Sequence, residues 1–190
     1  PKEMILTHAD LDHCGLAPVF DKVYTSAKSI ESLTEEYNDG EGFRERNPLH
    51  KPYITICKIL IRYEKTPPEV LENPGWKNKE KIDIVERVGE FKFGEFCFDV
   101  YETAGGHLPG EVVLLDFTNK IALTGDTFVN IKDMTPEQKA YNRHAPVLMT
   151  SVDFDPDLCD QQRHKLFDLL DQGNWKIVPS HGAILKSQIK

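Results

Sequence analysis

Four separate segments of this 190-residue chain follow apolar runs and carry side chains that bind metal ions. The first is THADLDHCG, from residue 7, and the later ones are GGHLPGE, LTGDTF and VPSHGA. Open α/β sheets place such residues just after buried strands, in loops that are rigid at the base and open to solvent. The pattern favours an α/β fold with one site built from four loops. The candidate metal ligands are His8, Asp10, Asp12, His13, His107, Asp126 and His181.

Imidazole and carboxylate groups are the ligands that borderline divalent ions and ferrous iron select. Because a carboxylate can reach between two ions, the seven side chains together predict a site for a pair of metals. Two ions held close together polarise an ester-type or phosphoryl group and generate hydroxide near neutral pH. The predicted chemistry is therefore hydrolysis.

Each candidate ligand also has an ordinary structural interpretation. Asp10 or Asp12 could cap the helix that follows, since aspartate accepts backbone N–H bonds at helix N-termini. His107 could be a hydrogen-bonded loop histidine, His181 could be a histidine at the end of a strand, and Asp126 could stabilise a Gly-Asp-Thr turn. Capping explains one aspartate, but not two histidines and two aspartates within six residues. The order and spacing of the whole set favour the metal site.

Net charge, apolar pattern and cysteine spacing restrict the kinds of molecule and compartment that suit this protein. A formal net charge of −8 leaves no continuous basic face for nucleic acid, so we expect a small-molecule substrate. We expect neither a membrane span nor a secretory signal, because no segment has the required apolar pattern. Four cysteines without a CxxC pair predict free thiols in a reducing compartment such as the cytoplasm: Cys14, Cys57, Cys97 and Cys159.

Apolar spacing and turn residues predict the order of the elements. The segment 38–81 contains five prolines and one apolar run, and we interpret it as an insertion or cap rather than sheet. An antiparallel pair is expected between residues 82 and 100, with its turn at Gly94. Further strands are expected at 4–6, 22–25, 112–117, 121–124 and 175–179, of which 175–179 is the last strand. Helices are expected at 15–20, at 26–37, after Thr135, and from Asp155 to Gly173.

The ordered set resembles the signature of the metallo-β-lactamase fold superfamily of metallohydrolases. The HxHxDH motif of that family corresponds to residues 8–13, and its later GH, Asp and final His correspond to His107, Asp126 and His181. The resemblance runs from about residue 2 to residue 183, with no counterpart for 38–81. It implies an α/β fold of the αββα sandwich type, as one domain over residues 1–190 with an insertion at about 38–81.

The resemblance also implies how the ligands divide between two ions, for which zinc is favoured. Asp12 and Asp126 would hold the attacking hydroxide and move its proton, which makes them the candidate catalytic residues. The implied ligand groups are His8, Asp10 and His107 for one ion, Asp12, His13 and His181 for the other, and Asp126 as the bridge.

The chain departs from the family pattern in two ways. Asp10 stands where the common signature has its second histidine, so the first site would be harder and more anionic and would also suit iron or manganese. A carboxylate there is similar to the flavodiiron branch, which places glutamate at this position and binds iron. Members also usually have several strands before the HxHxDH loop. We therefore expect strands to be missing before Pro1, with a second copy or the missing segment covering the open sheet edge.

These observations predict a metal-dependent hydrolase that uses a metal-bridging hydroxide on a small ester, thioester, lactone, amide-like ring or phosphoester. A thioesterase resembling the glyoxalase II group is one specific form of this hypothesis. The alternative is a non-haem iron oxidoreductase related to the flavodiiron branch, motivated by Asp10. A third hypothesis is a non-catalytic binding module on the same fold.

Overall fold

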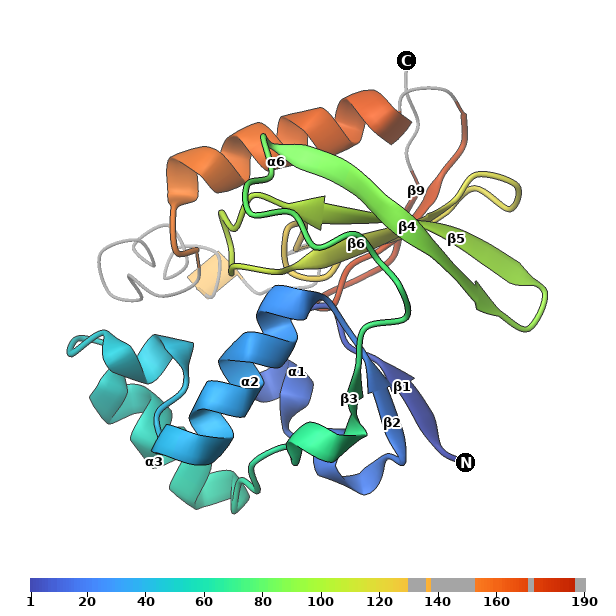
Figure 1. Ribbon diagram of the computed structural model, residues 1–190. Helices are drawn as coiled ribbons and strands as arrows, with labels where there is room; N and C mark the ends of the chain where they lie inside the picture. The colour runs from blue at the N-terminus through green and yellow to red at the C-terminus, as the bar shows by residue number, and fades with distance from the viewer. Residues whose placement is uncertain (130–135, 138–152, 171–172, 187–190) are drawn as a thin grey trace. The chain divides into compact units, whose positions relative to one another are not determined.

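The structure is a computed structural model that describes residues 1–129, 136–137, 153–170 and 173–186. The chain divides into two compact units, Pro1–Gly75 and Trp76–Lys190, and each unit has its own sheet (Figure 1). Of the helix expected after Thr135, only residues 136–137 are among those described. The interpretation of the chain as a single domain stays a prediction.

The first unit is built on a three-stranded parallel sheet with the order β1-β2-β3. Helices and short 3-10 turns connect these strands. In chain order the elements are β1 (Glu3–Ile5), α1 (Leu11–Cys14), η1 (Ala17–Val19), β2 (Lys22–Tyr24), α2 (Ala27–Asp39), η2 (Phe43–Arg46), α3 (Lys51–Ile61), η3 (Pro68–Val70) and β3 (Leu71–Glu72).

Helix α2 has clear sequence signals at both ends. The Ser26 hydroxyl accepts a hydrogen bond from the Ser29 amide at 3.1 Å, which caps the N-terminus. Gly40 ends the helix with a φ of 87°, a conformation that glycine adopts without steric cost. The helix buries Leu33 in a cluster with Leu6, directly after β1, and Val23 on β2. The prediction of a helix at 26–37 is therefore confirmed.

Two expectations for the first unit were wrong. The segment 38–81 is not free of sheet, because β3 pairs in parallel with β2. That strand has only two residues, too few to show an alternating pattern. The helix expected at 15–20 instead begins at Leu11, inside the ligand motif, and only a 3-10 turn follows at Ala17–Val19.

The second unit has a six-stranded sheet with the order β4-β5-β6-β7-β8-β9. Its strands pair antiparallel except for β7 and β8, which run in parallel. Strand β8 was expected to be the last, but the two-residue strand β9 follows it. The elements are β4 (Val85–Phe93), β5 (Phe96–Thr103), β6 (Val112–Asp116), β7 (Ile121–Leu123), α6 (Pro156–Leu170), β8 (Lys176–Val178) and β9 (Leu185–Lys186).

Helix α6 covers one face of this sheet (Figure 1). Leu166 and Leu170 on the helix pack with Val113, Leu115 and Ile177 on the strands, and all five side chains are buried. The same cluster contains Ala122 on β7, so this apolar contact fixes β7 and β8, the two strands that precede Asp126 and His181.

The four cysteines are free thiols, as expected, and two of them, Cys14 and Cys159, are buried. No helix among the described residues combines the length and the apolar character needed to cross a bilayer. The cytoplasmic location stays a prediction.

Candidate metal centre

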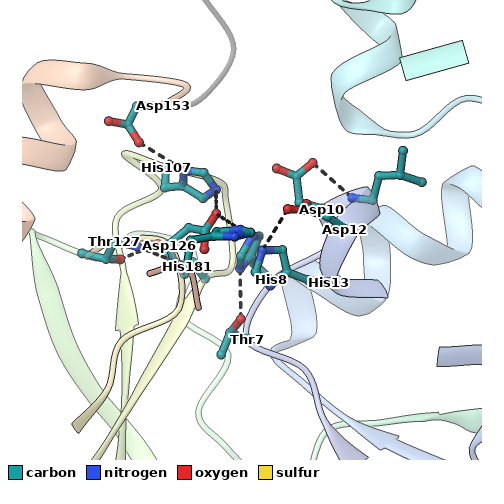
Figure 2. A network of polar contacts seen from close by, with 12 residues as sticks. Thr7, His8, Asp10, Asp12, His13, His107, Asp126, Thr127, Asp153 and His181 are labelled. Carbon is teal, nitrogen blue, oxygen red and sulfur yellow. Dashed lines mark hydrogen bonds and ion pairs between the residues drawn. The ribbon is translucent and has the colours of Figure 1, made fainter. Parts of the chain in front are cut away.

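The first unit brings two histidines and an aspartate of the ligand motif together. Strand β1 leads into the loop that carries His8, and α1 carries Asp12 and His13. The imidazole rings of His8 and His13 lie 4.2 Å apart between centroids, and His13 Nε2 lies 3.5 Å from Asp12 Oδ2 (Figure 2). Thr7 Oγ1 lies 3.0 Å from His8 Nδ1, a contact that orients the ring.

Asp10 has a different environment from its neighbours in the motif. Its carboxylate accepts a hydrogen bond from the Leu11 amide at 3.2 Å, so it is the N-cap of α1. Both of its oxygens also accept hydrogen bonds from Arg44 Nε at 2.8 Å, and Arg44 Nη2 lies 2.6 Å from Asp10 Oδ2. The capping interpretation of Asp10 is therefore confirmed, while its role as a metal ligand stays a prediction.

The second unit brings its three predicted ligands together around one carboxylate. Asp126 Oδ2 lies 3.6 Å from His107 Nε2 and 3.5 Å from His181 Nε2 (Figure 2). Asp126 and His181 follow the parallel strands β7 and β8, whose carboxyl ends meet at the same edge of the sheet. The Ser180 amide donates to the Gly125 carbonyl at 3.1 Å and joins the two loops.

The ring of His107 is oriented by a contact at Nδ1, the nitrogen that faces away from Asp126. His107 Nδ1 lies 3.1 Å from Asp153 Oδ1, and Asp153 Oδ2 accepts a hydrogen bond from Arg163 Nη2 at 2.9 Å. Arg163 Nε donates in turn to the Thr127 carbonyl at 2.8 Å, directly after Asp126. In metal-binding histidines, one ring nitrogen usually binds the metal while the other is held by a carboxylate, as Asp153 holds His107 Nδ1 here.

Sequence reasoning missed Glu111, whose side chain is fully buried. Its carboxylate accepts hydrogen bonds at 2.8 Å from the amides of Asp126 and Thr127, and another from the Thr127 hydroxyl. Burial raises the pKa of Glu111 above its usual range, against the lowering influence of His107 and of these hydrogen bonds. The signal available in the sequence was a charged residue at the start of an otherwise apolar strand.

The donor set of each unit fits a divalent ion, because each combines imidazole nitrogens with carboxylate oxygens. Separations of 3.5 to 3.6 Å are longer than normal hydrogen bonds and suit groups arranged around a shared ion. The first unit groups His8, Asp12 and His13, and the second groups His107, Asp126 and His181. That both groups form one site stays a prediction.

The family model described as the metallo-beta-lactamase superfamily matches residues 1–181. The chain belongs to this superfamily. The match spans all seven predicted ligands, and the fold is of the metallo-β-lactamase type, as the sequence predicted. No curated protein matches the chain.

Several solved structures resemble the chain in fold. The BLEG-1 B3 metallo-beta-lactamase aligns with a TM-score of 0.55 and 18% identity, over 98% of this chain and 72% of the other. TTHA1623 in a di-iron-bound form aligns with a TM-score of 0.53 and 18% identity, over 98% of this chain and 72% of the other. The TMB-1 structure aligns with a TM-score of 0.52 and 18% identity, over 97% of this chain and 62% of the other.

Proposed function

We propose that this protein is a metal-dependent hydrolase that binds two metal ions, with zinc favoured, through His8, Asp12, His13, His107, Asp126 and His181. The observation that carries the proposal is the approach of His107 and His181 to one oxygen of Asp126, at 3.6 and 3.5 Å. By the resemblance of their sequence motifs, these three residues would correspond to the later GH, Asp and final His of the superfamily signature.

Bound divalent ions supply Lewis acidity and lower the pKa of a coordinated water toward ~7. The residues of the chain supply position and proton transfer. Asp12 and Asp126 would hold the attacking water and accept its proton, since a positioned carboxylate can act as a general base. Asp153 and Glu111 keep His107 and Asp126 in fixed orientations, so that little reorganisation is needed during the reaction.

The substrate class in this proposal is a small ester, thioester, lactone, amide-like ring or phosphoester. The net charge of −8 supports a small substrate over a nucleic acid. The iron-oxidoreductase hypothesis predicts iron with a redox-linked colour, and the binding-module hypothesis predicts metal without turnover. The metal content and a hydrolysis panel distinguish all three.

The direct test is to strip the purified full chain with a chelator and reload it separately with zinc, manganese and ferrous iron. The proposal predicts no hydrolysis by the stripped protein and hydrolysis of at least one member of an ester, thioester, lactone and phosphoester panel after reloading. Metal binding without turnover on any substrate class would favour the binding module. Activity that survives complete removal of metal would contradict the proposal.

A further inference from the structure

The segment 38–81 contacts the ligand helix α1 through Arg44. This arginine lies on η2, where the Gly42 amide donates to Glu45 Oε2 at 2.8 Å and fixes the turn. Its guanidinium engages both oxygens of Asp10, and the two side chains are only 9% and 14% exposed. Two-pronged guanidinium–carboxylate pairs shielded from water are among the stronger polar contacts in proteins.

The same segment also reaches the other end of α1. Tyr63, beyond the end of α3, lies with its hydroxyl 3.6 Å from the sulfur of Cys14, the last residue of α1. That hydroxyl donates to Glu36 Oε2 at 3.1 Å. Lys58 on α3 forms ion pairs with both Glu36 and Glu45. Because Glu45 lies on η2 beside Arg44, these contacts connect the two ends of the network. Both ends of α1 are therefore held by one connected set of polar contacts within the first unit.

The pKa values in this network are consistent with a fixed structural role. Burial raises the pKa of Cys14 to about 12 and raises that of Tyr63 further above its ordinary value, so both groups stay protonated near neutral pH. Burial alone would lower the pKa of Lys58, but its hydrogen bonds with Glu36 and Glu45 outweigh that effect and raise it. Lys58 thus stays charged between the two carboxylates.

We propose that Arg44 holds Asp10 as an anchor of the ligand helix, so that one metal position lacks this carboxylate and binds its ion much more weakly than the other. The inference rests on the proposed function. The charge of Arg44 also cancels that of Asp10, which removes the anionic character expected to favour iron or manganese there. The segment 38–81 thereby sets the metal content of the site.

A zinc titration against a competing chelator tests this inference on the full chain. Wild type should bind one zinc tightly and a second at least about tenfold more weakly. Asp10→Asn should leave the tight zinc unchanged, because asparagine still caps the start of α1, which carries Asp12 and His13. Arg44→Gln should free Asp10 and strengthen the second zinc at least about tenfold. Arg46→Gln is the matched control, because this neighbouring arginine forms an exposed pair with Glu35 and should change neither zinc.

Thermal unfolding of the metal-free protein provides a second readout. Asp10→Asn removes the ion pair with the buried Arg44 and should lower the Tm by roughly 5–10 °C, whereas Arg46→Gln should lower it by less than about 2 °C. Loss of the tight zinc in Asp10→Asn, or two equally tight ions in wild type, would overturn the inference while leaving the proposed function standing. Absence of any zinc binding in wild type would overturn both.

Discussion

Asp153 Oδ1 lies 3.1 Å from Nδ1 of His107 and links a predicted metal ligand to helix α6. The other oxygen of that carboxylate accepts a hydrogen bond from Arg163 on α6, which also donates to the carbonyl that follows Asp126. Two of the three predicted ligands of the second unit therefore depend on one helix for their orientation. Outer contacts of this kind set metal affinity as well as geometry.

Replacing Arg163 with alanine should weaken zinc binding by about 10- to 100-fold, because both His107 and the Asp126 loop lose a support. Arg87→Ala is the matched control. Arg87 also pairs with two groups, Asp99 and Glu90, but it is well exposed and lies on β4. Competition with a chelator measures both variants, and equal zinc affinity in the two would show that Arg163 does not support the site.

The contacts of Asp153 with His107 and Arg163 also predict that the stability of the fold depends on pH. Burial acts to raise the pKa of Asp153, but hydrogen bonds from His107 and Arg163 outweigh it and hold that pKa below its ordinary value of 3.8. Ionised Asp153 thus contributes stability above about pH 4, and that contribution is lost as the pH falls through the lowered pKa. Asp153→Asn should be less stable than wild type at pH 7, with a difference that shrinks below pH 3.8. Urea unfolding across this range measures it, and a constant difference would contradict the assignment.

Glu111→Ala should lower the free energy of unfolding by about 3 kcal/mol, because it leaves three buried donors of Asp126 and Thr127 without their acceptor. Glu90→Ala on the exposed face of β4 should cost under about 0.5 kcal/mol. Urea denaturation of the metal-free proteins compares them. Equal stability of the two variants would mean that water replaces the Glu111 carboxylate at no cost.

Gly106 packs against the start of α6 so closely that a side chain cannot fit. A Cβ there would lie 2.4 Å from the Cys159 nitrogen, and the Gly106 amide donates to Gln162 Oε1 at 3.2 Å. Gly106→Ala should therefore cost about 1–3 kcal/mol and weaken zinc binding by moving His107. Gly94→Ala is the control, since it adds strain at a φ of 56° in an open turn and should leave zinc binding unchanged. Unchanged zinc affinity in Gly106→Ala would contradict this coupling.

Much of the fold could be predicted from local sequence. The helix at 27–39 carries its own cap and stop signals, and the β4–β5 and β6–β7 hairpins carry alternating apolar residues and turn residues. Strands β3 and β9 were not predictable, because two residues show no period and their pairing depends on long-range contacts.

The candidate ligands could be predicted because metal chemistry restricts their residue types, but their supports could not. Arg44 lies 34 positions from Asp10, and Arg163 lies 36 positions from Thr127. Neither pair shares a local motif, so only the folded chain shows the contact. These supports decide whether a nominal ligand such as Asp10 is available to a metal ion.

The most direct test of the metal centre is elemental analysis of two histidine variants purified identically with wild type. His181 and His164 are both exposed, at 48% and 78% of the side chain, so alanine at either position should leave the fold intact. We predict that His181→Ala loses bound metal and hydrolysis together, while His164→Ala keeps the wild-type metal content and rate. Equal metal content in His181→Ala, His164→Ala and wild type would contradict the proposed metal centre.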